Sequence, residues 1–194
     1  MKSQLSALSF MVRFGTNKKT EWVLNMFLSV SNLTKSYNKG IITHVLKGVG
    51  LEMERGQIGV LLGPSGSGKS TLLNIIGGVD RADDGAVEVD GERITDLNDH
   101  QLVEYRRESV GFVFQFYNLV PNLTVAENIE VVSNISKHPL KTEEVLSAVG
   151  LSDKKNRFPR ELSGGEQQRV SIARAIDGLF QLFAFWRGGR LGSS

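Results

Sequence analysis

Apolar and polar residues alternate along the first part of the chain in a way that predicts β-strands. Alternation from Phe27 to Leu33 and a second stretch from Val45 to Met53 both fit strands with one buried face. The segment from Ala86 to Ile94 alternates around Asp90-Gly91, a dipeptide that favours a tight turn between two antiparallel strands. This last segment therefore predicts an antiparallel β-arm.

Two continuous apolar runs predict a different kind of strand. The run from Gln57 to Leu62 is short and ends abruptly at Gly63, and a similar run extends from Val110 to Phe114. Runs of this kind are typical of strands that are buried on both faces within a parallel sheet.

Helical spacing appears between and after these runs. Apolar residues recur at helical intervals at Leu72, Leu73, Ile75, Ile76 and Val79. We expect this helix to end at Gly77-Gly78, and a second helical pattern extends from Thr124 to Gly150 with an interruption at Pro139. Strands separated by helices predict an α/β fold with a largely parallel sheet and an antiparallel arm.

The pattern divides the chain into three zones. Residues 1–26 are irregular and are expected to form a disordered N-terminal extension, whereas the strand and helix patterns fill residues 27–177. The composition changes again over residues 178–194, which we interpret as a separate tail.

Composition and charge narrow the class of protein. A chain of 194 residues is long enough for one globular domain with a substantial core. Its net charge of +2, with scattered basic residues, does not predict nucleic-acid binding. The absence of cysteine excludes disulfides and thiolate metal sites. No apolar run approaches the roughly 20 residues that a transmembrane helix needs.

The segment after the first apolar run matches the phosphate-binding P-loop, Gly63-x-x-x-x-Gly68-Lys69-Ser70. Glycines let backbone N–H groups approach phosphate oxygens closely, and the helix that follows presents its positive end to the same anion. Lys69 is expected to contact the β- and γ-phosphates, and the Ser70 hydroxyl to bind Mg²⁺. The predicted nucleotide contacts are Gly63, Pro64, Ser65, Gly66, Ser67, Gly68, Lys69, Ser70 and Thr71.

A second motif, Leu162-Ser163-Gly164-Gly165-Glu166, begins another predicted helix. Ser163 and Glu166 have the spacing of a capping box, and Val170, Ala173 and Ile176 give the helix an apolar stripe. With a P-loop upstream, this motif resembles the signature sequence of ATP-binding cassette (ABC) proteins. The resemblance covers residues 27–176 and is most similar to ATPases of bacterial macrolide-export, lipoprotein-release and antimicrobial-peptide-export systems.

The resemblance assigns further roles. It implies that Tyr37, in Asn32-Leu33-Thr34-Lys35-Ser36-Tyr37, stacks on adenine, and that Gln115 contacts Mg²⁺ and water as a supporting catalytic residue. Two copies of such a domain form a head-to-tail dimer in this family. The signature residues would then close over the ATP held by the partner copy, through Ser163, Gly164, Gly165 and Glu166.

The resemblance stops after the signature helix. The family pattern continues with an Asp-Glu pair that serves the Mg²⁺ shell and the attacking water, and later with a histidine. Here no Asp or Glu follows Asp177, and His44, His100 and His138 all precede the signature. The general base is therefore absent from these residues, and the C-terminal part of the core is expected to be missing.

Three explanations of residues 178–194 stay open. They are a frameshifted or fragmentary gene, a variant that binds nucleotide without hydrolysing it, and a divergent strand from Leu179 to Phe185.

The resemblance implies a function and a location. We expect the ATP-binding subunit of an ABC-type export system, with ATP and Mg²⁺ as cofactors and a membrane permease as partner. It would dimerise when nucleotide is bound and lie peripherally on the cytoplasmic face of the plasma membrane, without binding nucleic acid. The alternatives are a non-transport ABC protein that acts on DNA or ribosomes, and a non-functional fragment.

Overall fold

The computed structural model describes residues 26–38, 40–113, 116–134, 136 and 139–176, and the backbone of residues 182–185. The chain divides into two compact units, Met1–Leu102 and Val103–Ser194. The predicted extension and most of the predicted tail lie outside the described residues.

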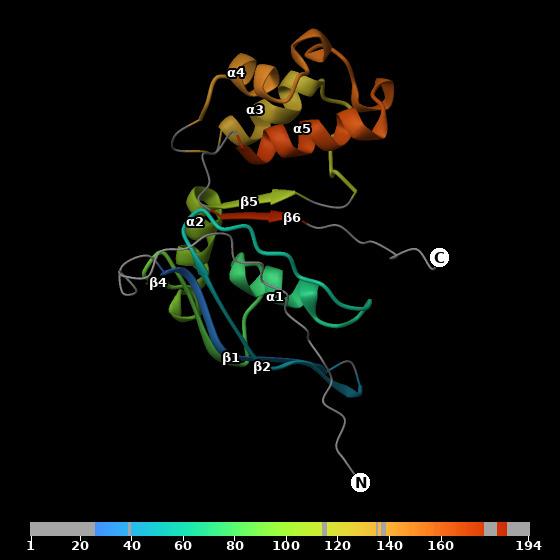
Figure 1. Cartoon of the computed structure of the whole chain (residues 1–194). Coiled ribbons are helices and arrows are strands. Elements are labelled where there is room, and N and C mark those ends of the chain that lie inside the picture. The colour runs from blue at the N-terminus through green and yellow to red at the C-terminus, as the bar shows by residue number, and fades with distance from the viewer. Residues whose placement is uncertain are drawn as a thin grey trace. The chain divides into compact units, whose positions relative to one another are not determined.

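A four-stranded antiparallel sheet forms the framework of the first unit, with strand order β2-β1-β3-β4 (Figure 1). Its strands are β1 (Met26–Asn38), β2 (Ile42–Glu54), β3 (Asp84–Val89) and β4 (Glu92–Arg93). The predicted strands in these regions are confirmed, and the two long ones extend several residues further than the alternation indicated.

Cross-strand pairs explain the burial of one face of this sheet. Val30 pairs with Val87 and Leu28 with Val89, and all four side chains are buried. The turn between β3 and β4 has left-handed φ angles of 51° at Asp90 and 81° at Gly91. Both angles fit the tight hairpin turn that this dipeptide predicts.

Helix α1 (Lys69–Ile76) contacts β2 and buries the apolar stripe that predicted it, namely Leu72, Ile75 and Ile76. Gly77 caps its C-terminus, as expected. The short 3-10 helix η1 (Ile94–Asp96) and helix α2 (Asp99–Ser109) follow β4. The sequence pattern did not predict α2, whose exposed surface is strongly polar.

The predicted strand from Gln57 to Leu62 is wrong. This run has no regular secondary structure, and the exposed fractions of Ile58, Val60 and Leu62 are 87%, 55% and 50%. An apolar run becomes a buried parallel strand only where neighbouring strands bond to it and helices cover both faces. No strand in the described ranges pairs with residues 57–62.

The described part of the second unit contains a two-stranded parallel sheet, most of α2 and several further helices. Strands β5 (Val110–Val113) and β6 (Leu182–Phe185) pair in parallel from Val110 with Leu182 to Val113 with Phe185. Strands β5 and β6 are thus paired in parallel, whereas the strands of the first unit are paired antiparallel. Strand β6 lies within residues 178–194, which the composition indicated to be a separate tail. One of the three explanations of this segment was a divergent strand from Leu179 to Phe185, and β6 falls inside that range.

Helices α3 (Val125–Ser133), α4 (Thr142–Ala148) and α5 (Gly164–Ile176) pack against one another (Figure 1). Two short 3-10 helices, η2 (Ser152–Lys154) and η3 (Pro159–Glu161), precede α5. The break between α3 and α4 confirms the interruption predicted around Pro139. The shared core consists of Val125, Ile129, Val145, Leu146, Leu151, Leu162, Val170 and Ala173.

The buried side chain of Asn128 forms hydrogen bonds with the backbone of the loop that precedes α3. Its side chain is 1% exposed, and its Oδ1 accepts the N–H of Val120 at 2.8 Å. Its amide group donates to the carbonyls of Val120, Leu123 and Thr124 at 2.9–3.1 Å. One buried side chain therefore satisfies several backbone groups of the loop before the helix.

We expect Asn128→Ala to lower the free energy of unfolding by about 2–4 kcal/mol, because several backbone groups would lose their partner at a buried site. Urea unfolding followed by circular dichroism measures this. The matched control is Asn122→Ala, an exposed asparagine of the same loop, which should change stability by less than about 0.5 kcal/mol. Equal losses for both variants would contradict the role of Asn128.

Candidate functional site

The predicted phosphate loop connects the irregular run after β2 with the first turn of α1. Residues 63–68 have no regular secondary structure, and Lys69, Ser70 and Thr71 form the start of the helix. Gly68 has a left-handed φ of 88°, and a Cβ there would lie 2.9 Å from Leu46 Cδ2. A side chain at this position would be both strained and crowded, so the loop enters the helix this way only with glycine.

The loop curls around the ammonium group of Lys69. Lys69 Nζ donates to the carbonyls of Gly63 at 2.8 Å and Pro64 at 2.7 Å, and to Ser67 Oγ at 3.2 Å. These three acceptors match the three protons of an ammonium group. None of the salt bridges found in the described part of the chain includes Lys69. The loop thus holds a cation that no described carboxylate neutralises.

The N-terminus of α1 differs from those of α3 and α5. Helix α1 has no side-chain cap and no acidic residue in its first turn. By contrast, Thr124 and Glu127 form a complete capping box on α3. The first N–H groups of a helix need acceptors, and their partial positive charge favours an anion. Together with the Lys69 ammonium, the start of α1 is therefore suited to bind phosphate.

The signature motif forms the capping box that its sequence predicted. Ser163 N–H and Ser163 Oγ both lie within hydrogen-bond distance of Glu166 Oε2, at 2.8 and 2.7 Å, and Glu166 N–H donates to Ser163 Oγ at 3.3 Å. Hydrogen bonds from the Ser163 hydroxyl and backbone hold the pKa of Glu166 below its usual value. Ser163, Gly164 and Gly165 are exposed. The carboxylate of Glu166 is therefore engaged within the motif, while the exposed residues are accessible to a ligand.

Tyr37 lies near the C-terminal end of β1. Its hydroxyl donates a hydrogen bond to Asp80 Oδ2, and the side chain of Thr71 of α1 lies beside the same hydroxyl. Burial raises the pKa of the Tyr37 phenol, and the hydrogen bond to Asp80 raises it further. Tyr37 therefore keeps its proton at neutral pH and lies within reach of the helix that follows the phosphate loop.

Gln115, the predicted Mg²⁺ and water contact, lies outside the described residues, so its place in the site stays a prediction. The segment that follows it is held by Arg174 of α5. The guanidinium donates to the carbonyl of Asn118 at 2.7 Å and to that of Tyr117 at 2.9 Å. Burial lowers the pKa of Arg174. Both Tyr117 and Asn118 have left-handed φ angles, so Arg174 stabilises an unusual backbone turn.

Sequence reasoning missed Asp80 and Lys35, which contact Tyr37 in the first unit, and Arg174, which contacts the segment after Gln115 in the second unit. Lys35 and Tyr37 are two positions apart on one strand, and therefore on one face, which is the signal that could have drawn attention to Lys35. The other two act over separations of 43 to 57 residues, which no local pattern reveals.

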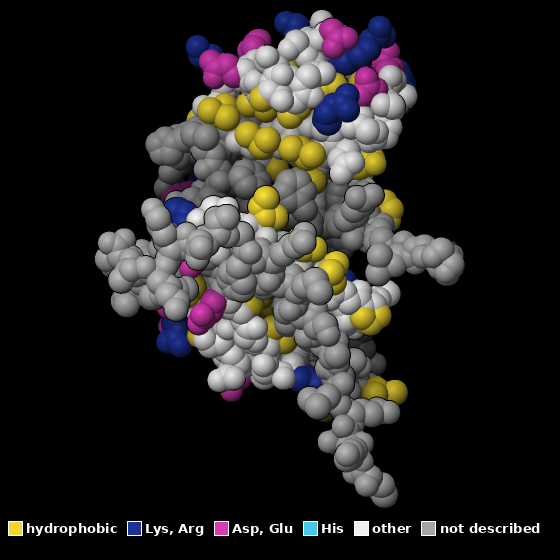
Figure 2. All heavy atoms as spheres, in the orientation of Figure 1, with side chains coloured by type: hydrophobic (Ala, Val, Ile, Leu, Met, Phe, Trp, Pro, Cys, Tyr) yellow, Lys and Arg dark blue, Asp and Glu magenta, His cyan; other side chains and the backbone are white. Residues whose placement is uncertain are grey.

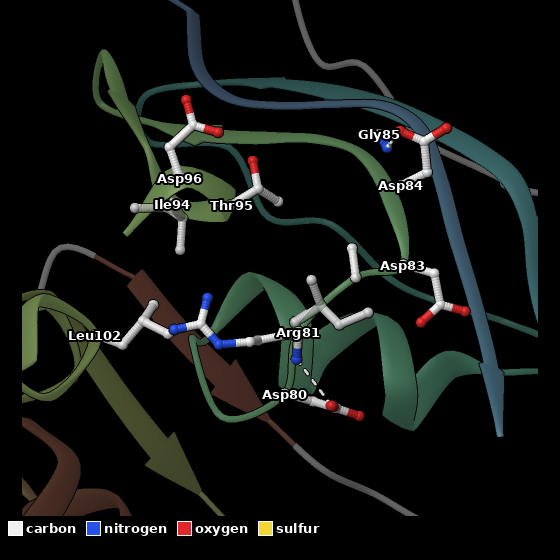
Figure 3. A pocket seen from close by; sticks show the side chains of 11 residues that line it. Asp80, Arg81, Asp83, Asp84, Gly85, Ile94, Thr95, Asp96 and Leu102 are labelled. Carbon is white, nitrogen blue, oxygen red and sulfur yellow. Dashed lines mark hydrogen bonds between the residues drawn. The ribbon is translucent and has the colours of Figure 1, made fainter. Parts of the chain in front are cut away.

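A cavity of about 230 Å³ lies beside Asp80 in the first unit (Figure 3). Asp80, Asp83, Asp84 and Asp96 contribute carboxylates to its lining. Across the described ranges, no group of three or more His, Asp or Glu side chains has a geometry that could hold a metal ion. Asp80 and Asp83 instead pair with Lys35, with N···O distances of 3.3 and 3.5 Å.

The residues present fit a bound Mg-nucleoside triphosphate. The unneutralised Lys69 ammonium and the uncapped start of α1 supply the positive charge that polyphosphate requires. The Ser70 hydroxyl, in the first turn, is an oxygen ligand of the kind that Mg²⁺ prefers. Tyr37 provides an aromatic ring on the same unit for a base.

The chain matches a family model described as ABC transporter over residues 46–182. This match continues past residue 177, where the sequence pattern alone had ended the family-like region. The chain is also 49% identical over 153 residues to a putative ABC transporter ATP-binding protein of Mycoplasma pneumoniae. That alignment covers 77% of this chain and 33% of the relative, so the chain spans about a third of that protein.

Two further comparisons also match proteins that are named for ATP binding. The ATP-binding protein of a lipoprotein-releasing system from Rhodopirellula baltica is 43% identical over 155 residues, which cover 77% of this chain and 68% of that protein. The solved dimeric structure of an ATP-binding cassette in a post-hydrolysis state, bound to ADP and Pi, matches with a TM-score of 0.73 and 39% identity. It covers 81% of this chain and 72% of that one. No described helix is both long and apolar enough to span a membrane.

We expect Arg174→Met to lower the free energy of unfolding by about 1–3 kcal/mol, because the carbonyls of Tyr117 and Asn118 would lose a charged donor. Arg174→Lys should give an intermediate loss, because an ammonium cannot reproduce the two-pronged contact. Chemical denaturation measures both. Arg169→Met, on the exposed face of the same helix, is the control and should change stability by less than about 0.5 kcal/mol. A loss as large as that of Arg174→Met in this control would refute the assignment.

Proposed function

The chain belongs to the ABC transporter family, and on this basis we propose that it is the ATP-binding subunit of an ABC-type membrane export system. In this proposal the chain binds Mg-ATP at residues 63–71 and couples that binding to transport by a membrane permease. The observation that carries it is the Lys69 ammonium, enclosed by the loop's own acceptors beside the uncapped start of α1.

Binding of a triphosphate would exchange one set of Lys69 acceptors for another. The carbonyls of Gly63 and Pro64 are neutral acceptors, whereas phosphate oxygens are charged and form stronger hydrogen bonds with an ammonium group. The N–H groups of the first turn of α1 would donate to the same anion. Bound Mg²⁺ would neutralise part of the phosphate charge, with Ser70 and the predicted Gln115 as its protein ligands.

The signature motif is proposed to complete the site of a second copy. Ser163, Gly164 and Gly165 are exposed at the start of α5, where a hydroxyl and backbone N–H groups can meet a phosphate. The solved relative that is bound to ADP and Pi is a dimer, which supports an assembly of two copies. Nucleotide held between two copies would then favour the dimer by mass action.

The charge distribution supports a permease rather than a nucleic acid as partner. On the second unit, Lys141, Lys154 and Arg157 each pair with an acidic side chain. Basic and acidic side chains intermingle on the part of this surface that Figure 2 shows, whereas nucleic-acid sites concentrate positive charge. Relatives include ATP-binding subunits of lipoprotein-releasing and bacitracin export systems. A permease partner would keep the chain on the cytoplasmic face of the membrane.

Loss of the Lys69 ammonium tests the phosphate site. We expect Lys69→Ala to weaken Mg-ATP binding by about 100-fold, because the principal cation of the loop is removed. Isothermal titration calorimetry measures the affinity. Lys47→Ala removes an exposed lysine of β2 and should leave the affinity unchanged. Unaltered binding by Lys69→Ala would contradict the assignment.

A charge placed in the signature tests the proposed dimer. Ser163→Asp places a carboxylate at the N-cap of α5, a position where Asp is also favoured, and this charge would repel a phosphate of the partner copy. We expect it to abolish ATP-dependent dimerisation in analytical ultracentrifugation without weakening ATP binding by the monomer. Ser163→Thr retains the hydroxyl and should dimerise normally. Full dimerisation of Ser163→Asp would show that the signature does not meet the partner's nucleotide.

A further inference from the structure

The residues after α1 fold back onto the C-terminal half of β1. Val79 and Asp80 N–H groups both donate to the carbonyl of Asn74, at 2.8 and 3.2 Å, which turns the chain sharply after the helix. Asp83 N–H then donates to the carbonyl of Thr34 at 2.9 Å. Residues 79–83 are therefore fixed by backbone hydrogen bonds beside the strand that carries Tyr37.

Lys35 links this segment to the Tyr37 ring. Its side chain is only 13% exposed, and its ammonium donates to the carbonyl of Arg81 at 2.6 Å. The same ammonium pairs with Asp80 at 3.3 Å and lies 5.2 Å from the centroid of the Tyr37 ring, over one face. Because the cation covers one face of the ring, a base that stacks on Tyr37 would use the opposite face.

Asp80 is the acceptor that joins these groups. Its carboxylate accepts hydrogen bonds from the Tyr37 hydroxyl and, at 2.8 Å, from the N–H of Arg81, which Figure 3 shows as a dashed line. Burial works against its ionisation, but the bonds from Tyr37 and Arg81 and the charge of Lys35 lower its pKa overall. Asp80 is thus a carboxylate at neutral pH and a charged acceptor for the phenol.

The Thr71 side chain, two residues after Lys69, lies beside the Tyr37 hydroxyl. The ring is therefore held at its tip by Asp80 and along one face by Lys35. A ring that is already oriented loses little conformational freedom when a base stacks on it, so more of the stacking energy appears as affinity.

We propose that Asp80 and Lys35 are positioning residues that orient the Tyr37 ring for the adenine of ATP, with the base on the face opposite Lys35. This inference rests on the proposed binding of Mg-ATP. It predicts that the two residues contribute to recognition of the base and not to recognition of the phosphates, which the loop at residues 63–70 would bind separately.

Comparison of two ligands isolates the base. Affinities of the full chain for Mg-ATP and Mg-tripolyphosphate are measured by calorimetry, and their ratio gives the preference for a ligand that carries the base. We expect Asp80→Ala and Tyr37→Phe each to lower this ratio by about 3- to 10-fold while leaving tripolyphosphate affinity unchanged. The double variant should lose less than the two single losses combined, because the bond between the Tyr37 hydroxyl and Asp80 is lost in both.

Conservative substitutions and a nearby aspartate provide the controls. Asp80→Asn retains an acceptor for the phenol and should recover most of the ratio. Asp96→Ala removes another carboxylate of the same cavity, one that pairs with Arg93 at 3.8 Å, and should leave the ratio unchanged. If Asp80→Ala does not fold, Tyr37→Phe still decides, because it keeps the ring and every other contact of Asp80.

The outcomes separate this inference from the proposed function. A wild-type chain that binds neither ligand would contradict the proposed function itself. A wild-type preference for ATP that Tyr37→Ala removes, but that Tyr37→Phe and Asp80→Ala both retain, would overturn the positioning role and leave ATP binding intact.

Discussion

The ammonium of Lys69 imposes the central constraint on the first unit. This half-exposed cation, which no described carboxylate neutralises, is held within the loop by the backbone carbonyls of Gly63 and Pro64. That geometry depends on the close fit of Gly68 against β2 and on α1, whose buried stripe anchors the loop to the sheet. The loop is therefore held in a form that suits the proposed exchange of its own carbonyls for phosphate oxygens.

The N-termini of the described helices are satisfied in different ways. Glu127 and Glu166 complete capping boxes on α3 and α5, so these helix ends carry an internal negative charge. Helix α1 has no such side chain and depends on an external acceptor. The uncapped end of α1 is therefore the one proposed to bind phosphate within its own unit, whereas the capped end of α5 is proposed to meet the phosphate of a second copy.

Local sequence patterns predicted the features that neighbouring residues determine. The P-loop spacing located α1, the Ser163–Glu166 spacing predicted a capping box, and Asp90-Gly91 predicted the β3–β4 turn. The same reasoning failed for residues 57–62, because apolar character predicts burial but does not supply a pairing strand. It also missed Asp80 and Arg174, because their partners lie 43 to 57 residues away.

The most direct test of the central claim is amide hydrogen exchange of the chain with and without Mg-ATP. A triphosphate bound by Lys69 and the start of α1 would slow exchange of the N–H groups in residues 65–71, which have few acceptors of their own. Exchange in α3, whose first turn is capped internally, would stay the same. Unchanged exchange over residues 65–71 at saturating Mg-ATP would contradict nucleotide binding at this loop.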